Sequence, residues 1–530
     1  MKSEVLLGDE AVALAAVHAG LSAAYSYPGT PASEIMEYLL RPPAEQRGYT
    51  AAWSVNEKTA YEEALGASFA GKRAMVSFKH VGLNVAADPF MNSALTGVGG
   101  GLVVVSADDP SMHSSQNEQD SRFYADFARI FCFEPANPQE AYDMTREAFD
   151  LSEQLDLPVM VRLTTRISHS RSVVRPRPPR PQNPLRLGQA QDWTLLPVNA
   201  RRRFKLLLER QEELHRVSAG SAHNVLKLNG QDRGLGVIAS GIAYNYVQEN
   251  IRELGSPPSL LKISTMPVPQ DLVRRLVDHV DRVLVAEEGY PLLEARLRGI
   301  YGVPGKVIQG RQSGELPAQG ELSPDLLREA LGMKPLDRFR PDEMKLAGRP
   351  PQLCAGCPHA DTFKALNEAL RGRAGANVFS DIGCYTLGAY PPYNAVQTCV
   401  CMGASVGMAK GGSEAGIRPA VAVIGDSTFG HSGITPLLSA ARANTDMTVF
   451  ILDNSTVAMT GGQTSFTTGQ GLLRLVQGLG VPPEHIRVIE PLPRNHAENV
   501  RVIGQELDHQ GLSVIIAGRE CVTYSSKRRG

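Results

Sequence analysis

Two apolar runs that each end in polar residues decide the fold of the last third of this chain: Ala420-Val-Ala-Val-Ile-Gly-Asp-Ser427 and Met447-Thr-Val-Phe-Ile-Leu-Asp-Asn454. Short apolar runs of this kind are typical of buried strands, and the segment between them has a helical composition. Because a strand, a helix and a second strand form a parallel pair, both polar endings should lie at one edge of a sheet. We therefore expect Asp426 and Asn454 to face one another.

The residues at this edge predict a site for a divalent cation and a diphosphate. Mg²⁺ prefers oxygen ligands in an octahedron, and Asp426, Asn454 and the carbonyl of Thr456 can supply three of them. Gly425 and Ser427 leave room and donors for a diphosphate at the start of the following helix. A single Gly-Asp after a strand is more often only a turn, and the second polar ending is what favours a site.

The amino-terminal part of the chain has the pattern of an α/β fold. From Val5 to about Thr165, short apolar runs alternate with amphipathic stretches, which indicates a mainly parallel sheet flanked by helices. We expect a helix at residues 57–71 and strands at residues 51–55, 73–78, 101–106 and 157–163.

The remaining boundaries follow from proline-rich stretches. The run RPRPPRPQNP at 175–184 cannot continue a helix or a central strand. We expect a multidomain chain with an α/β domain at 1–174, a linker and helical segment at 175–232, a small α/β domain at 233–312, a second linker at 313–350 and the diphosphate-binding α/β domain at 351–530.

Composition excludes several classes of protein. Lys plus Arg number 54 against 55 Asp plus Glu, so the charge excess of a nucleic-acid-binding protein is missing. No apolar run is long enough for a membrane helix, and Glu4, Asp9 and Glu10 stand where a secretory signal would be cationic and then apolar. We expect a cytoplasmic protein with no nucleic-acid or membrane partner.

The two polar endings resemble the thiamine diphosphate motif, in which Gly-Asp-Gly or Gly-Asp-Ser is followed one strand-helix-strand unit later by Asn. Its partner feature is a glutamate from another α/β domain, which contacts the aminopyrimidine ring and promotes the imino tautomer. Trp53-Ser-Val-Asn-Glu57, followed by a helix face of small residues, fits this feature. On its own, Glu57 would more often be an acid at a helix start.

With these features together, the chain resembles the alpha-type subunits of indolepyruvate ferredoxin oxidoreductases, within the thiamine-diphosphate-dependent 2-oxoacid:ferredoxin oxidoreductases. The matching stretches are LLGDEAVALAA (6–16), YPGTPASEI (27–35), NEKTAYEEALGASFAG (56–71), KHVGLNVAADP (79–89), DDPSMHSSQNEQDSR (108–122), CAGCPH (354–359), DIGCYTLG (381–388), CMGASVGMAKG (401–411) and the region 424–463.

The resemblance implies a role for each matching residue. Glu57 would serve the cofactor ring, and Thr30 in the YPGTP turn would lie near the 2-oxoacid carboxylate, although a plain Pro-Gly turn remains an alternative for that stretch. The domain at 1–174 would be of the pyrimidine-binding type and that at 233–312 transketolase-C-like. The residues implied to bind the cofactor or Mg²⁺ are Gly403, Gly425, Asp426, Ser427, Asn454 and Thr456.

The reaction that the resemblance implies is oxidative decarboxylation of an arylpyruvate, either indolepyruvate or phenylpyruvate. A thiamine diphosphate enamine would be oxidised in one-electron steps, giving aryl-acetyl coenzyme A, CO₂ and reduced ferredoxin. Two alternatives remain open. A non-oxidative 2-oxoacid decarboxylase would keep Glu57, Asp426 and Asn454 without an iron-sulfur cluster, and a non-catalytic subunit would keep only the fold.

Four cysteines are candidates for such a cluster. Cys354 and Cys357 form a C-x-x-C, Cys384 follows in DIGCY, and Cys521 lies in ECVTY. This layout is similar to that of one [4Fe-4S] cluster in related oxidoreductases, and four thiolates are the usual complement.

Other readings of the cysteines stay open. The C-x-x-C could bind zinc together with Cys399 and Cys401, or carry out disulfide chemistry. Cys132 lies in an apolar run and is predicted to be a buried core residue.

The sequence departs from the family in one respect. Alpha-type subunits typically end in a ferredoxin-like module with two C-x₂-C-x₂-C-x₃-C-P runs, and no such run occurs in these residues. We therefore expect a hetero-oligomer with a smaller gamma- or beta-type subunit, and transfer of electrons to ferredoxin directly or through a partner subunit.

Overall fold

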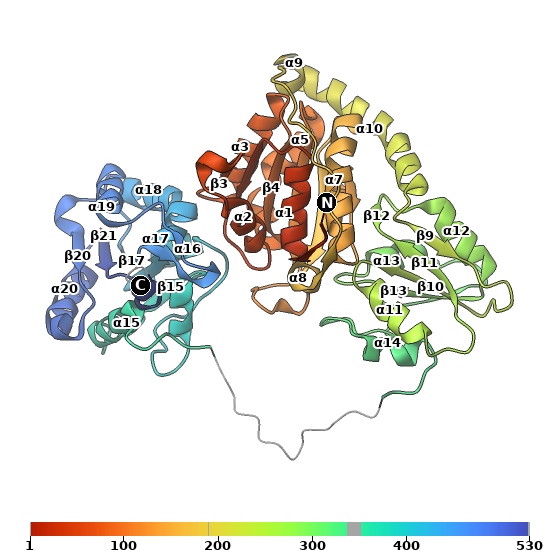
Figure 1. Cartoon of the computed structure of the whole chain (residues 1–530). Helices are drawn as coiled ribbons and strands as arrows, with labels where there is room; N and C mark the ends of the chain where they lie inside the picture. The colour runs from red at the N-terminus through yellow and green to blue at the C-terminus, as the bar shows by residue number, and fades with distance from the viewer. Residues whose placement is uncertain (1, 189, 337–350, 528–530) are drawn as a thin grey trace. The chain divides into compact units, whose positions relative to one another are not determined.

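Parallel sheets flanked by helices make up both parts of the chain, as the sequence predicted (Figure 1). A computed structural model describes residues 2–188, 190–336 and 351–527. The chain divides into two units, residues 1–339 and 340–530, which are described separately below.

The first unit is built on a seven-stranded sheet. Six strands are parallel, and the short edge strand β12 pairs antiparallel with β6. Nearly every residue of the central strands is buried, which suits a parallel sheet covered on both faces. In sheet order the strands are β12 (Thr265–Met266), β6 (Phe131–Phe133), β7 (Val159–Thr164), β5 (Leu102–Asp108), β4 (Ala74–Lys79), β2 (Ala23–Ser26) and β3 (Thr50–Trp53).

Helices between these strands cover the sheet. In one group α1 (Gly8–His18) packs against α2 (Ser33–Leu40) and α7 (Pro138–Leu155), and in another α3 (Glu57–Phe69) packs against α5 (Ala87–Thr96). The start of α3 is set by Asn56, whose side chain accepts a hydrogen bond from the Thr59 N–H, as is typical of an N-cap.

The proline-rich stretch that we expected to be a linker lies along the first sheet's helices. Residues 175–188 form no helix or strand, yet the Arg180 N–H donates to the His18 carbonyl at 3.0 Å and the Arg186 N–H donates to the Ala70 carbonyl at 2.9 Å. The chain then continues into α9 (Ala190–Trp193) and the long helix α10 (Pro197–Gly220).

A second, five-stranded sheet completes the first unit and shares its core. Leu261 of this sheet belongs to the same buried cluster as Phe133 of the first sheet. The strands in sheet order are β14 (Val307–Gln309), β13 (Arg282–Ala286), β10 (Leu235–Ser240), β11 (Ser259–Ile263) and β9 (Val225–Lys227), and the helices are α11 (Ala243–Ile251), α12 (Gln270–His279), α13 (Leu292–Arg298) and α14 (Pro324–Ala330).

Helix α14 falls within residues 313–350, where we expected only a connection. The Ser323 side chain caps its first turn by accepting from the Leu326 N–H, and Leu327 is buried with Leu331 against the five-stranded sheet. The capping serine and the apolar face explain the helix. Residues 337–350 of the expected linker lie outside the described residues.

Buried ion pairs join the two sheets of the first unit. The guanidinium of Arg122, which is fully buried, lies 2.5 Å from Asp120 and 2.9 Å from Glu287, the residue that follows β13. Arg162 of β7 pairs with Asp108 at 2.7 Å and with Glu134 at 2.5 Å. The second sheet is therefore held against the first by charges as well as by apolar packing.

The second unit is built on one parallel sheet of five strands with helices between them. Its strands in sheet order are β15 (Asn377–Ser380), β16 (Ala420–Gly425), β17 (Met447–Asp453), β21 (Leu512–Gly518) and β20 (Ile486–Ile489). The longer helices are α15 (Pro358–Ala369), α16 (Ala404–Glu414), α18 (Ile434–Ala443), α19 (Gly469–Gly478) and α20 (His496–Asp508), and a small hairpin pairs β18 (Thr456–Val457) with β19 (Gln463–Thr464).

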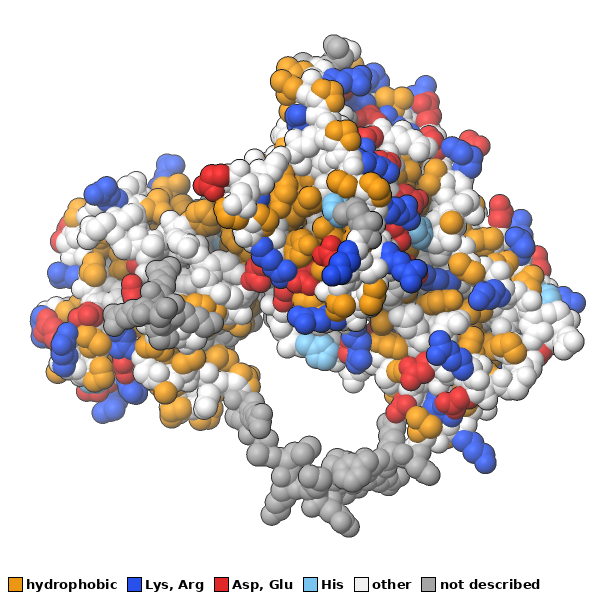
Figure 2. Space-filling view, in the orientation of Figure 1, with side chains coloured by type: hydrophobic (Ala, Val, Ile, Leu, Met, Phe, Trp, Pro, Cys, Tyr) orange, Lys and Arg blue, Asp and Glu red, His pale blue; other side chains and the backbone are white. Residues whose placement is uncertain are grey.

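Charged side chains of both signs are interspersed over the face of the first unit that Figure 2 shows. None of the helices in the described part of the chain is both long enough and apolar enough to span a membrane.

Candidate functional site

The two polar strand endings of the second unit lie at one edge of its sheet, as predicted. Strands β16 and β17 are parallel neighbours, with Gly425 in register with Leu452. Asp426 follows β16 directly, and Asn454 follows β17.

Asp426 is a buried carboxylate without a full set of partners. Its side chain is 2% exposed, and its Oδ2 has no hydrogen-bond partner among the described residues. Burial, and then the neighbouring Asp453 carboxylate, raise the pKa of Asp426 to about 8, although hydrogen bonds from Ser427, Ser465 and Ser455 act in the opposite direction. A divalent cation would supply the positive charge that this site lacks.

Asn454 and Thr456 lie beside this carboxylate in a tight turn. The Thr456 N–H donates to Asn454 Oδ1 at 3.2 Å, and Ser455 between them has a left-handed backbone with φ 64°. Asp453 is held by Thr468 Oγ1 at 2.6 Å and by the Gly469 N–H at 2.7 Å. The oxygen-rich turn has the donor type that Mg²⁺ requires.

Two predicted glycines stand where a side chain would not fit. A Cβ on Gly425 would lie 2.7 Å from Cε1 of Tyr385, and a Cβ on Gly403 would lie 2.5 Å from Cβ of Ser432. Gly403 also has φ 81° at the start of α16. Ser427 lies in the helical turn Asp426–Thr428 directly after β16. The two glycines therefore let the backbone pack closely against Tyr385 and Ser432. The polar residues Asp426 and Ser427 that follow β16 are of the kind that fit a diphosphate with its cation.

In the first unit, Glu57 and Thr30 lie at the carboxyl edge of the seven-stranded sheet. Thr30 follows β2 and Glu57 follows β3, and these two strands are parallel neighbours. Glu57 is 5% exposed. A Cβ on Gly82 would lie 2.7 Å from Cγ of Glu57, so the missing side chain of Gly82 makes room for this carboxylate.

A lysine that sequence reasoning missed lies at the same edge. Lys79 is the last residue of β4 and is buried. Burial lowers its pKa to about 8, and the carboxylates of Asp109 and Glu57 offset only part of this effect. The sequence contains a feature that could have indicated this lysine, because Lys79 and His80 directly follow the predicted strand at 73–78.

The four predicted cysteine ligands influence one another electrostatically. Burial, and then the thiols of Cys357, Cys521 and Cys354, raise the pKa of Cys384 to about 12. The Cys357 N–H donates to the Cys354 carbonyl at 3.1 Å, and the Cys521 N–H donates to the Asn454 carbonyl at 3.1 Å. Three segments far apart in sequence, which contain Cys354 and Cys357, Cys384, and Cys521, therefore converge beside the predicted cation site.

The other cysteines do not join this group. Cys399 and Cys401 are exposed. Partial burial of their thiols and the Asp381 carboxylate raise their pKa values, and none of the four predicted ligands contributes. Cys132 lies in β6 and is fully buried, as predicted. In the described ranges, no three His, Cys, Asp or Glu side chains already stand at the distances of a metal site.

His359 and Asp381 are further buried groups at this edge that the sequence did not single out. His359 follows the C-x-x-C, and its Nε2 lies 3.2 Å from Nδ2 of Asn454. Burial lowers the pKa of His359 to about 4, so the neutral ring can accept a hydrogen bond from the Asn454 amide. The Asp381 carboxylate accepts hydrogen bonds from the Tyr385 hydroxyl and from Ser405 Oγ at 2.6 Å.

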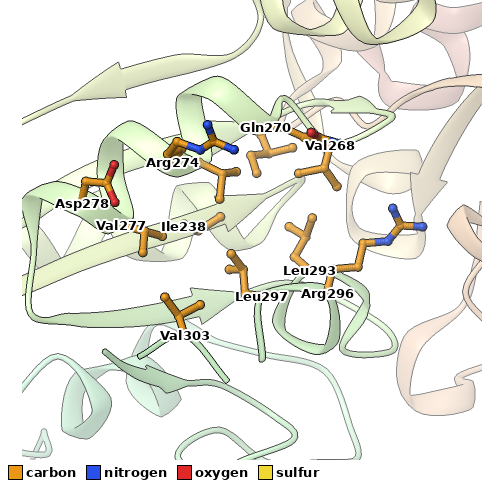
Figure 3. A pocket seen from close by; sticks show the side chains of 12 residues that line it. Ile238, Val268, Gln270, Arg274, Val277, Asp278, Leu293, Arg296, Leu297 and Val303 are labelled. Carbon is orange, nitrogen blue, oxygen red and sulfur yellow. The ribbon is translucent and has the colours of Figure 1, made fainter. Parts of the chain in front are cut away.

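A pocket of about 470 Å³ lies elsewhere, on the five-stranded sheet (Figure 3). Side chains of α12 and α13, among them Val277 and Leu297, line it together with Ile238 of β10. No predicted site residue contributes to it.

Two family models match the parts of the chain that contain these two edges. Residues 14–192 match the family described as "Pyruvate flavodoxin/ferredoxin oxidoreductase, thiamine diP-bdg", and residues 381–514 match "Thiamine pyrophosphate enzyme, C-terminal TPP binding domain". The first match contains Thr30 and Glu57, and the second contains Asp426 and Asn454.

Full-length relatives extend the comparison over the chain. Indolepyruvate oxidoreductase subunit IorA of Archaeoglobus fulgidus is 39% identical over 559 residues, which cover 99% of this chain and 87% of that protein. The subunit of the same name from Methanothermobacter thermautotrophicus is also 39% identical, over 99% of this chain and 88% of that protein.

Among solved structures, the 2-oxoglutarate:ferredoxin oxidoreductase from Magnetococcus marinus has a similar fold. Its TM-score is 0.52 at 16% sequence identity, and the match covers 62% of this chain and 65% of that one. From the shared fold, the two family matches and the full-length relatives, the chain belongs to the thiamine-diphosphate-dependent 2-oxoacid oxidoreductases, in the family of the indolepyruvate oxidoreductase IorA subunits.

Proposed function

We propose that this chain is the subunit that carries out oxidative decarboxylation of an arylpyruvate, indolepyruvate or phenylpyruvate, with coenzyme A. In the balanced reaction, one arylpyruvate, one coenzyme A and two oxidised ferredoxins give one aryl-acetyl coenzyme A, one CO₂, two reduced ferredoxins and one proton. The relatives named indolepyruvate oxidoreductase over nearly the whole chain support the substrate class.

The single observation that carries the proposal is the buried carboxylate of Asp426, with one oxygen unpartnered among the described residues, at the edge that Asn454 shares. We propose that Asp426, Asn454 and the Thr456 carbonyl hold Mg²⁺, and that Gly403, Gly425 and Ser427 border the diphosphate of thiamine diphosphate. When bound, the cofactor supplies an electron sink for loss of the substrate carboxylate.

Glu57 and Thr30 have roles in the first unit under this proposal. The Glu57 carboxylate would accept a hydrogen bond from the aminopyrimidine ring and hold a proton there during turnover. Its burial against Gly82 supports this role, because a dry pocket strengthens such a hydrogen bond. The Thr30 hydroxyl would donate to the 2-oxoacid.

The electron relay of the proposal is a [4Fe-4S] cluster on Cys354, Cys357, Cys384 and Cys521. Their mutual electrostatic influence and the hydrogen bond from the Cys521 N–H to the Asn454 carbonyl support this set over one that includes Cys399 and Cys401. Such a cluster would lie beside the cation site and could accept electrons one at a time. A smaller partner subunit and ferredoxin would then complete a hetero-oligomer.

The experiment that tests the function is an anaerobic assay of the enzyme purified with its co-expressed partner subunit. Indolepyruvate, phenylpyruvate, pyruvate and 2-oxoglutarate are compared for reduction of ferredoxin with and without coenzyme A. We expect reduction that requires both coenzyme A and an arylpyruvate. Release of CO₂ with no reduction of ferredoxin would instead indicate the non-oxidative decarboxylase, and no turnover of any of the four acids would indicate a non-catalytic subunit.

Replacing Asp426 by Ala should abolish the Mg²⁺-dependent binding of thiamine diphosphate. Since loss of a group that only supports a metal ligand costs about 10- to 100-fold in affinity, loss of a ligand should cost about 100-fold or more. Isothermal titration calorimetry with thiamine diphosphate at fixed Mg²⁺ measures the change. The control is Asp446→Ala, which removes an aspartate that pairs with Arg418 at 2.6 Å just before β17. Equal affinities of both variants would contradict the assigned ligand.

Replacing Cys354 by Ser should remove the iron from the protein. We expect about four irons with matching acid-labile sulfide per wild-type chain, and a loss of most of both in Cys354→Ser. Cys399→Ser, which alters an exposed thiol outside the group of four, should keep its iron. Zinc in the wild-type protein, or iron loss in Cys399→Ser alone, would contradict the proposed cluster.

A further inference from the structure

Lys79 is a buried cation at the edge of the sheet that carries Thr30 and Glu57. It ends β4, the neighbour of β2 in the sheet, and it is only 9% exposed. Lys and Glu are seldom this buried unless paired, so the position of Lys79 calls for a physical explanation.

The stem of Lys79 packs against the turn that contains Thr30. A Cβ on Gly29 would lie 3.2 Å from Cδ of Lys79 and 3.3 Å from its Cγ, so the turn can approach this closely only because residue 29 is a glycine. The Ser114 hydroxyl donates to the Thr30 carbonyl at 3.3 Å, and Lys79 Nζ donates to the Ser114 carbonyl at 3.0 Å. Lys79, Thr30 and Ser114 thus form one small cluster.

The ammonium group of Lys79 has unused hydrogen-bonding capacity. An ammonium carries three N–H donors. Within the described residues Lys79 makes one hydrogen bond, to the Ser114 carbonyl, and no carboxylate oxygen lies within 4.0 Å of its Nζ. The carboxylates of Asp109 and Glu57 act on the Lys79 ammonium electrostatically and raise its pKa, but neither forms an ion pair with it.

Asp109 cannot easily serve as its counter-ion, because neutral donors already occupy its oxygens. Asp109 Oδ2 accepts from the Ser114 N–H at 2.8 Å and from Ser115 Oγ at 2.7 Å, and Oδ1 accepts from Thr165 Oγ1 at 2.8 Å. Its role is to shape the loop after β5. A buried ammonium with incomplete compensation favours an incoming anion.

We infer that Lys79 binds the carboxylate of the 2-oxoacid substrate, with its Nζ donating hydrogen bonds to the group that is lost as CO₂. This inference rests on the proposed function and adds to it the residue that recognises the acid. Thr30, whose hydroxyl makes no hydrogen bond with any described residue, would contribute a second donor from the same cluster.

The test compares Lys79→Met with Lys79→Arg in the complete enzyme loaded with Mg²⁺ and thiamine diphosphate. Met keeps the unbranched stem against Gly29 and removes only the charge and donors. Two ligands distinguish the roles: 3-phenylpropanoate, which carries a carboxylate, and 3-phenylpropanamide, which has the same shape without charge. Their binding is measured by calorimetry, and the KM and kcat for phenylpyruvate are measured alongside.

Loss of hydrogen bonds to a charged group predicts that Lys79→Met weakens 3-phenylpropanoate binding and raises the KM for phenylpyruvate by about 10- to 100-fold. Binding of the amide and of thiamine diphosphate should stay within about twofold, and Lys79→Arg should recover part of the carboxylate binding. Lys58→Met, which removes an exposed lysine paired with Glu62 on α3, should leave all four values unchanged.

An active Lys79→Met enzyme with an unchanged KM and unchanged 3-phenylpropanoate binding would overturn the inference alone. A loss of thiamine diphosphate affinity without a change in KM would also overturn it, since Lys79 would then act through Glu57. A wild-type enzyme that binds 3-phenylpropanoate through Lys79 but oxidises neither indolepyruvate nor phenylpyruvate would overturn the proposed function and leave the role of Lys79 standing.

Discussion

Replacing Glu57 by Gln should leave the protein folded and able to bind thiamine diphosphate, while turnover falls by about 100-fold or more. General acid–base groups contribute about 10²- to 10⁴-fold to rates, and the amide cannot hold the proton that the carboxylate holds. Glutamine has nearly the same size, so the contact with Gly82 and the cap of α3 by Asn56 are preserved. Steady-state kinetics and calorimetric titration of the cofactor separate these two effects.

Glu62 provides the matched control for this variant. It lies on the same helix as Glu57, is exposed and pairs with Lys58, so Glu62→Gln makes the same chemical change away from the site. Its turnover should equal that of the wild-type enzyme. Full activity in Glu57→Gln would show that the assigned residue has no part in proton transfer.

Replacing Arg122 by Ala should destabilise the first unit by about 3 to 5 kcal/mol, because removing one partner of a buried ion pair leaves the other charges uncompensated. Arg122 is fully buried and lies 2.5 Å from Asp120, 2.9 Å from Glu287 and 3.6 Å from Glu134. It also donates to the Tyr290 carbonyl at 3.0 Å. Urea unfolding followed by circular dichroism measures the shift of the transition that contains this unit.

A second arginine in the same unit serves as the control. Arg296 of α13 lies 2.5 Å from Asp126 on the helix Arg122–Ala128, and both side chains are more than 40% exposed. Since exposed pairs contribute about 0 to 1 kcal/mol, Arg296→Ala should shift the transition little. Equal effects of the two substitutions would contradict a stabilising role for the buried network.

Most of the fold was predictable because it depends on local patterns. The expected strands at 51–55, 73–78, 101–106 and 157–163 correspond to β3, β4, β5 and β7, and the expected helix at 57–71 corresponds to α3. Continuous apolar runs mark strands buried on both faces of a parallel sheet. The two-residue strand β12 was missed, since Thr265–Met266 has no such run and is a strand only because Phe133 and Cys132 pair with it.

The candidate site was predictable where strand endings determine it. Asp426 and Asn454 follow neighbouring parallel strands of the second unit. The strand-helix-strand pattern of the sequence is therefore enough to predict that both residues lie at the same edge of the sheet. Lys79 was missed although it also ends a strand, because a single lysine carries no motif. Its significance comes from Gly29, Ser114 and Asp109, which approach it from other parts of the sheet edge.

By itself, the sequence determined the α/β class, the paired strand endings and the motifs by which the family could be named, because these depend on short-range patterns along the chain. Only the tertiary structure decided which thiols influence one another, that Arg122 joins two sheets, and that Lys79 is buried with no carboxylate oxygen within 4.0 Å of its Nζ among the described residues. The physical reason is that burial and electrostatic interaction depend on distances between residues remote in sequence, and packing alone sets those distances.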